Sequence, residues 1–301
     1  MNPSAECFVC GHGALGPGSP GYAQCPHCGH ETLAEHGRQA FIVNDILEPP
    51  GPPNALDRFK ERVLSRALAS GAANSLLLDV GSASGRFLWF SRDRFLRAAG
   101  LEISPQALQY SRELGLDVRT SVEEMDGAPS VITCWHSLEH FPRESLLSLL
   151  ACLQRCSSPD ARLIVSVPDA ASLQCRMLGT RYPYRDVPAH LHQFTDKSLD
   201  ILLARHGFIP SFSCFSSAYS AFGWLQGLMN IFETPMNYYY YRKKRGHTFG
   251  LDEQSLRCKD RRNLALVGLC ALPALAMTCF EALIPVAKGV LTRCYQRKPW
   301  T

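Results

Sequence analysis

The sequence has little charge and no low-complexity tract. Only 19% of its 301 residues are charged and the net charge is +4, so the composition carries no strong nucleic-acid signal. Glycine (22) and proline (20) are too few for a repetitive chain, and 46% hydrophobic residues exclude a disordered one. The first residues have neither a basic segment nor an apolar run, and we predict no secretory signal peptide there.

Cysteine is abundant, but a disulfide framework is not expected. Thirteen is an odd count, and nine of the cysteines are scattered, mostly in apolar stretches, where cysteine packs as a small hydrophobe. We therefore expect a reducing, cytoplasmic setting. The other four cysteines form two Cys-x-x-Cys pairs near the start of the chain, which are Cys7 with Cys10 and Cys25 with Cys28.

These two pairs predict a structural Zn²⁺ site. Each pair places two thiolates on one tight turn, and the glycine that follows it permits the dihedral angles of that turn. Four thiolates are the ligands of a closed tetrahedral zinc site, and metal binding would fold a segment that has a poor core of its own. A redox Cys-x-x-Cys motif is one alternative. A Cys₃His site is another, with a ligand from the nearby histidines His12, His27, His30 and His36.

The pattern along the chain divides it into four parts. Residues 1–47 predict a small zinc-ribbon-like module, and the Pro-rich residues 48–53 predict a stiff linker. Residues 54–215 alternate between apolar runs and helical-period segments, which predicts an α/β core with a mostly parallel sheet. Residues 216–301 are aromatic and basic, then apolar, and we expect them to complete or cap that core.

Within the core, the individual elements can be placed. Asn54 is expected to cap a helix from Leu56 to about Ala69. Short apolar runs predict strands at 75–80, 98–103, 130–135 and 162–167. Helical-period segments separate them at about 85–97, 105–114 and 143–155.

The first strand leads into a turn of small residues, Asp79-Val80-Gly81-Ser82-Ala83-Ser84-Gly85, and then a helix. Small residues let a ligand approach the backbone, and a helix N-terminus offers free N–H groups. The second strand ends at Glu102, where such folds place an acid that accepts hydrogen bonds from a ribose. Together they predict a nucleotide-type site at the carboxyl edge of the sheet.

This turn resembles the signature of the class I S-adenosylmethionine-dependent methyltransferases. Further segments resemble the group that contains the ubiquinone-pathway O-methyltransferases: Ile132 to Phe141 its fourth strand, Arg162 to Asp169 its fifth, and Pro188 to Thr195 the stretch before its sixth. Within the family, the chain is most similar to members with an N-terminal Cys₄ knuckle, which often act in polysaccharide or modified-sugar pathways. The resemblance implies a Rossmann-like sheet with helices on both faces.

The resemblance also implies the cofactor S-adenosylmethionine and the residues that bind it. These are Asp79, Gly81, Ser82, Ala83, Gly85, Glu102, Ile103, Val122, Trp135 and His136. The chain departs from the family pattern at Ala83, where the usual residue is glycine, and at Pro129-Ser130, where an acid usually opens the fourth strand.

Methyl transfer to a hydroxyl or carbon needs a base. We predict His140 and His190 as catalytic candidates, ahead of His136 and His192. His190 and His192 alternate along an extended segment, so only one of them can face the site. The expected acceptor is a small molecule or a sugar or glycan precursor, methylated on oxygen or carbon. The alternatives are an rRNA or tRNA base methyltransferase and a non-catalytic binding protein on a degenerate methyltransferase fold.

The C-terminal extension allows three interpretations. Basic and aromatic clusters precede an apolar stretch, 264–287, which is close to the length that crosses a bilayer but contains Pro273, Glu281 and Pro285. The stretch fits a helical pair that covers the active site, followed by a last strand at 289–297. It also fits an interfacial segment, with peripheral contact of 238–291 at the inner face of the cell membrane, or a true membrane span.

Overall fold

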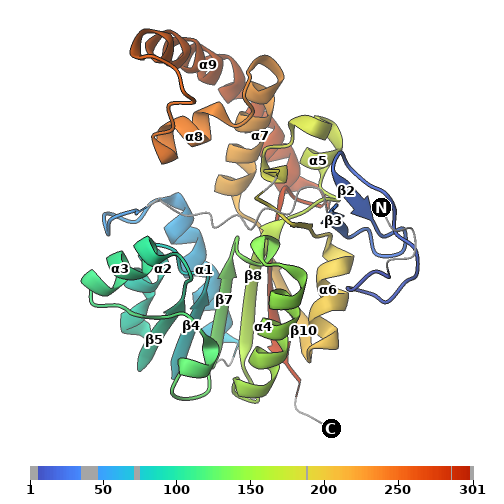
Figure 1. The fold of residues 1–301 in the computed structure, drawn as a ribbon, viewed down its shortest axis with the longest axis vertical. Coiled ribbons are helices and arrows are strands. Elements are labelled where there is room, and N and C mark those ends of the chain that lie inside the picture. Colours follow the sequence, from blue (N-terminus) through green and yellow to red (C-terminus); the bar gives the residue numbers. More distant parts are fainter. Residues whose placement is uncertain (1–5, 35–46, 71–74, 188, 286, 299–301) are drawn as a thin grey trace.

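The computed structural model describes residues 6–34, 47–70, 75–187, 189–285 and 287–298 (Figure 1). Its centre is a seven-stranded sheet in the order β10-β11-β8-β7-β4-β5-β6. The strands are β4 Leu76–Val80, β5 Arg97–Leu101, β6 Asp117–Arg119, β7 Val131–Trp135, β8 Arg162–Pro168, β10 Phe208–Cys214 and β11 Val290–Arg297. β11 runs antiparallel to both its neighbours, whereas β4 to β8 pair in parallel. The predicted Rossmann-like α/β class is confirmed.

Helices cover both faces of this sheet (Figure 1). They are α1 Ala55–Ala69, α2 Arg86–Ser91, α3 Pro105–Glu113, α4 Arg143–Cys156 and α6 Asp196–Arg205. Alternation along β7 divides the core, because successive strand residues point to opposite faces. Ile132 and Cys134 pack in one cluster with the leucines of α4 and α6, and Val131 and Trp135 pack in the other with α1 and α2.

Most of the predicted elements are present, and one is shorter. Asn54 caps α1 as predicted, and its side chain and that of Asp57 form a capping box. The segment 85–97 is not one helix. α2 ends at Ser91, a 3₁₀ turn follows at Arg92–Arg94, and β5 begins at Arg97.

The N-terminal residues form three short strands, β1 Gly16–Pro17, β2 Tyr22–Gln24 and β3 Glu31–Leu33, which pair with β9 His192–Gln193 in a second sheet. β9 belongs to the stretch 54–215, so this module docks on the core by strand pairing. The boundary between module and linker stays a prediction, because residues 35–46 lie outside the described part of the chain.

The C-terminal extension forms three helices over the carboxyl edge of the sheet (Figure 1). They are α7 Ser217–Phe232, α8 Tyr238–Arg245 and α9 Glu253–Leu283. The chain then returns into the sheet as β11, which is the predicted last strand. Between β8 and β9 lie α5 Leu173–Leu178 and two 3₁₀ turns, Gly179–Arg181 and Pro183–Arg185.

Candidate active site and cysteine cluster

A cavity of about 700 Å³ lies at the carboxyl ends of β4, β5 and β7. This is where ligands bind in open parallel sheets. Its walls include every predicted cofactor and catalytic residue except Gly85: Asp79, Gly81, Ser82, Ala83, Glu102, Ile103, Val122, Trp135, His136, His140 and His190. The fold brings these residues together although Asp79 and His190 are 111 positions apart in the chain (190 − 79).

The turn after β4 is held open by backbone geometry. Gly81 has a φ of +71°, and a Cβ on it would stand 2.6 Å from the Cβ of Ser137. Gly85, at φ +73°, does not line the cavity. A Cβ there would stand 2.4 Å from the Cδ1 of Leu116, so this glycine allows α2 to begin close against the segment after α3.

Glu102 joins this turn to the end of β5. Its Oε2 accepts a hydrogen bond from the Ala83 backbone N–H at 2.8 Å. Its Oε1 accepts from the N–H groups of Ile103 and Ser104 at 2.7 and 2.8 Å. The carboxylate is fixed beside the turn, as the resemblance implies, and retains lone pairs for a ligand hydroxyl.

Asp79 and Lys60 influence each other electrostatically, a relation that no sequence pattern predicted. Thr133 donates to Asp79 Oδ1 at 2.6 Å, and burial raises the pKa of Asp79 to about 6. Burial lowers the pKa of Lys60, whose Nζ lies 5.3 Å from the Trp135 ring centroid. The sequence does contain an indication of this buried lysine. Lys60 is one turn from Leu56 and from Leu64 on the apolar face of α1, where a charged residue is unusual.

The cavity fits a polar ligand. Buried polar atoms in its walls have no hydrogen-bond partner within the described residues, namely Ser82 Oγ, Trp135 Nε1, His136 Nε2 and Ser137 Oγ. Such atoms are rare in native structures unless water or a ligand satisfies them. They lie on the turn after β4 and at the end of β7, where the resemblance places the cofactor.

Three histidines surround a buried glutamate after β7. His136, with φ +54°, brings its Nδ1 to 3.2 Å from Oε1 of Glu139. The rings of His140 and His190 meet edge to face at 4.6 Å. Burial raises the pKa of Glu139, but the hydrogen bond from His136 and the neighbouring imidazoles outweigh it and lower the pKa to about 2. Glu139 is therefore a carboxylate near neutral pH.

Backbone carbonyls fix the tautomers of two of these rings. Nδ1 of His140 lies 2.9 Å from the Ala189 carbonyl oxygen, and Nδ1 of His190 lies 2.7 Å from that of Tyr184. A carbonyl only accepts, so each Nδ1 carries the proton and each neutral ring keeps a lone pair on Nε2. Burial lowers the pKa of His190 to about 4, which keeps it neutral.

Glu139, His140 and His190 also form a donor set. Their ligand atoms lie within 4.8 Å of one another. Two imidazoles and a carboxylate are donors that a divalent transition metal accepts, and they are equally suited to hold or move a proton.

His192 faces away from the cavity. It lies in β9, 3.3 Å from the Thr32 hydroxyl, and its ring packs near His30 and Phe194 beside the N-terminal module. Of the two alternating histidines, His190 lines the cavity and His192 does not.

The far wall of the cavity is aromatic, and most of it comes from the C-terminal extension, which one of the three interpretations of the sequence placed over the site without naming these residues. It consists of Tyr184, Tyr219, Phe222 and Tyr240, from the turn after α5 and from α7 and α8. The His136 ring lies 4.8 Å from Tyr219 and 6.1 Å from Tyr184. The cavity thus has a polar end at β4 and β5 and an aromatic end beneath the C-terminal helices.

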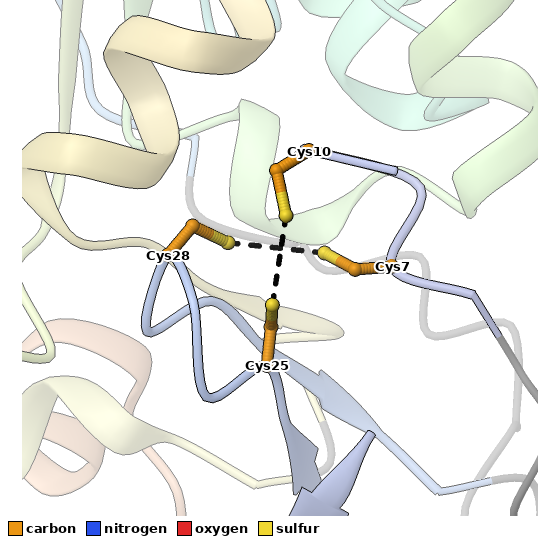
Figure 2. Close-up of side chains that lie close together, drawn as sticks. All are labelled: Cys7, Cys10, Cys25 and Cys28. Carbon is orange, nitrogen blue, oxygen red and sulfur yellow. Dashed lines mark hydrogen bonds between the residues drawn. The ribbon is translucent and has the colours of Figure 1, made fainter. Parts of the chain in front are cut away.

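The four N-terminal cysteines converge as predicted (Figure 2). The Sγ atoms of Cys7 and Cys28 are 3.8 Å apart, and those of Cys10 and Cys25 are 3.6 Å apart. A tetrahedral site with Zn–S bonds of about 2.3 Å has S···S edges of about 3.8 Å. The four thiols therefore have the spacing that a Cys₄ site requires. Among the described residues no histidine joins the cluster, which disfavours His12, His27 and His30 as ligands of a Cys₃His site, and His36 lies outside the described part of the chain.

A buried histidine outside the cavity gives a test of the packing by pH. Burial lowers the pKa of His192 to about 4, so below about pH 6.5 the unfolded chain binds a proton that the folded one does not, and stability is lost as the pH falls. Asp79 and Asp169, with pKa values raised by burial to about 6 and about 7, act in the opposite direction. The contribution of His192 is therefore measured as the difference in unfolding free energy between a His192 variant and the unsubstituted protein.

Between pH 7.5 and pH 5, His192→Asn is expected to gain about 2 kcal/mol in unfolding free energy relative to the unsubstituted protein. Urea unfolding at the two pH values measures this change. His247→Asn, at an exposed position, is the control and should follow the unsubstituted protein. An equal pH dependence in all three proteins would contradict the packing described for His192.

Comparisons with known proteins agree with this geometry. A family model described as a methyltransferase domain matches residues 54–209, just over half of the chain. No curated protein matches the sequence. Among solved structures, a putative sarcosine dimethylglycine methyltransferase from Galdieria sulphuraria has a TM-score of 0.50 at 13% identity, covering 80% of this chain and 86% of its own.

Two further structures are similar. The [4+2]-cyclase SpnF has a TM-score of 0.50 at 18% identity, with 85% of this chain and 86% of that chain covered. A SAM-dependent methyltransferase from Archaeoglobus fulgidus has a TM-score of 0.46 at 15% identity, covering 80% and 94%. At such identities, the likeness to the two structures with a TM-score of 0.50 shows the fold alone. The family match, together with the turn after β4 and the sheet order, shows that the chain belongs to the class I S-adenosylmethionine-dependent methyltransferases.

Proposed function

We propose that this methyltransferase methylates an oxygen or carbon of a small polar acceptor, a sugar or glycan precursor being the favoured class, with His140 or His190 as the base. The observation that carries the proposal is the pair of Nε2 lone pairs, fixed by backbone carbonyls, at the junction between the polar and aromatic ends of the cavity. A neutral imidazole in this position can take the proton that the acceptor loses.

The polar end of the cavity fits the cofactor. The amides of the turn after β4 and the Glu102 carboxylate would hold it. Val122 would lie near its adenine, and Trp135 and His136 near its sulfonium. S-adenosylmethionine supplies an activated methyl group. The chain's own contribution is to align the acceptor for displacement and to exclude water.

The aromatic end supports a small acceptor. Tyr184, Tyr219, Phe222 and Tyr240 offer ring faces to an apolar surface such as one face of a sugar ring, and Asp186 adds a carboxylate at the same end. The cations among the lining residues are Lys60 and Arg86, and Arg86 pairs with Asp57 at 2.8 Å. A wall with so few free cations does not favour an RNA substrate, whose phosphates need a basic groove.

We also propose that the four cysteines hold a structural Zn²⁺. The thiols lie in a closed, mostly buried cluster, without the open coordination position that a catalytic zinc needs. The metal would stabilise the module that carries β3, and β3 in turn pairs with β9 next to the loop of His190.

Calorimetric titration with S-adenosylmethionine tests the cofactor part of the proposal. We expect saturable binding, and Glu102→Gln should weaken it roughly 10- to 100-fold, because a charged hydrogen-bond acceptor is lost. Glu113→Gln, on the exposed side of α3, is the matched control. Absence of saturable heat in the unsubstituted protein would support a non-catalytic binding protein instead.

Transfer of labelled methyl groups tests the acceptor class. The protein is incubated with labelled S-adenosylmethionine and, in parallel, with free hexoses, nucleotide sugars or bulk RNA. Label in the sugar fractions supports the proposal. Salt-sensitive label in RNA, with none in the sugars, would overturn it in favour of a nucleic-acid substrate.

A further inference from the structure

From residue 263 onward, helix α9 turns its polar residues toward the protein and large apolar side chains outward. Its buried residues form one stripe that includes Asn263, Thr278 and Glu281. Glu281 is fully buried and accepts hydrogen bonds from the Ser220 hydroxyl at 2.6 Å and the Gln174 amide at 3.2 Å. The glutamate that interrupts the apolar sequence therefore points inward, and its Oε2 is hydrogen-bonded.

The outer face of α9 consists of large apolar side chains. We call these residues the apolar face of α9: Leu264 (72% exposed), Leu269 (64%), Leu272 (77%), Leu275 (55%), Phe280 (49%) and Leu283 (84%). Only 22% of the most apolar 18-residue window of the helix is buried. A surface helix of a water-soluble protein has the reverse arrangement, so this helix is built for an apolar environment.

Helix α7, on which α9 packs, also buries polar side chains, together with Trp224 and Met229. Its buried residues include Ser220, Gln226 and Asn230, and Gly223 and Gly227 bring it close to neighbouring side chains. At its end, Ile231 and Phe232 are each 50% exposed. Polar residues that face the bundle and apolar residues that face outward are the pattern of helices in contact with lipid.

The connections of α9 are inconsistent with a membrane span. The chain before it, α8, lines the cavity with Tyr240, and the chain after it enters the central sheet as β11. Both ends of α9 are thus attached to the same folded body. A helix held in this way can lie on a bilayer but cannot place its ends on opposite sides of one.

The charge next to the apolar face identifies the kind of surface it fits. Residues 238–262 contain eight basic and three acidic residues, an excess of +5, whereas the whole chain carries +4. The segment between them and the sheet, 263–285, has a single charged residue, the buried Glu281. Exposed basic residues beside an apolar helix complement an anionic lipid headgroup layer.

We propose that the apolar face of α9 docks on the surface of an anionic lipid bilayer. The helix lies in the headgroup region, the exposed basic residues Lys243, Arg257, Arg261 and Arg262 contact the phosphates, and the folded core stays in water. Docking does not depend on which acceptor is methylated, since the apolar face and the cavity walls are separate sets of residues.

Vesicle flotation of the full chain tests the proposal. We expect binding to vesicles of phosphatidylcholine with phosphatidylglycerol, weaker binding to phosphatidylcholine alone, and release as the salt concentration rises. Leu272→Gln and Leu283→Gln should each weaken binding about tenfold, and the double variant about a hundredfold. Leu96→Gln, at a position 81% exposed before β5, is the matched control and should bind like the unsubstituted protein.

The affinity for S-adenosylmethionine, measured on the same samples, shows whether each variant is folded, because none of these leucines lines the cavity. Failure of the unsubstituted protein to bind either vesicle, or equal binding by the double variant, would overturn the proposal. A dimer in solution that the double variant converts to monomer, without vesicle binding, would overturn it in favour of a second copy on this face.

Discussion

Replacing the base with alanine is expected to lower kcat by roughly 10²- to 10⁴-fold, which is the usual contribution of a general base. The candidates are His140 and His190, whose Nδ1 protons are directed to the carbonyls of Ala189 and Tyr184. Whichever ring contacts the acceptor should show the full loss in its alanine variant. The measurement is turnover with saturating cofactor, using an acceptor found by labelled methyl transfer.

The pH profile distinguishes the two rings. The pKa of His190 is lowered to about 4 by burial and by His140 beside it, and a base acts only when it is deprotonated. If His190 is the base, kcat/KM of the free enzyme is maintained as the pH falls and is lost only on passing through about 4. Calorimetry must show that each variant still binds S-adenosylmethionine, and His247→Ala is the control. Unchanged turnover in both His140→Ala and His190→Ala would rule out both candidates.

Loss of one cysteine ligand is expected to unfold the N-terminal module and to abolish most of the activity. Zinc contributes about 10–16 kcal/mol to the folding of small Cys-ligated modules, more than the three short strands here can replace. Cys25→Ser should therefore lose bound zinc and lower the melting temperature. The matched control is Cys258→Ser, because Cys258 is exposed on α9. Metal content and calorimetric melting are the measurements.

The activity should fall when the metal is lost, because the module holds the loop of His190 in place. The Tyr22 hydroxyl donates to the His190 carbonyl at 2.7 Å. Arg185, in the same loop, forms a buried ion pair with Glu31 at 3.0 Å. Both contacts disappear if the module unfolds, and the buried Arg185 loses its charged partner.

Tyr22→Phe separates the loss of zinc from the loss of the contact with the His190 loop. It keeps the four thiols and should keep the zinc, but it loses the hydrogen bond to the loop, so we expect a fall in turnover of about tenfold with little loss of metal. A Cys25→Ser protein that retains zinc, melting temperature and turnover would contradict both the metal site and its link to the loop.

Local patterns in the sequence predicted the parts of this protein whose structure depends on near neighbours. The turn Asp79 to Gly85 needs small residues and positive φ angles, and Glu102 follows at the end of the next strand. The two Cys-x-x-Cys turns supply their own ligand geometry. The helix from Ala55 begins where Asn54 can cap it.

Sequence patterns indicated other features only weakly. β6, Asp117–Arg119, is an edge strand of three residues with two charged side chains, so no apolar run marked it. The segment 85–97 kept a helical pattern past Ser91 although the chain turns into β5 there. Periodicity alone does not identify the end of such a helix, because burial against the sheet decides where it ends.

By itself, then, the sequence determined the family, the cofactor turn, the cysteine cluster and the order of the main elements. Only the tertiary structure placed Lys60 beside Asp79, chose His190 over His192, and assembled an aromatic wall from Tyr184, Tyr219 and residues further along the chain. It also turned Glu281 inward and left the leucines of α9 exposed. The physical reason is how far apart in the sequence the interacting residues lie. Turns, caps and ligand pairs depend on a few adjacent residues, whereas a cavity wall and an exposed face depend on which distant segments pack together.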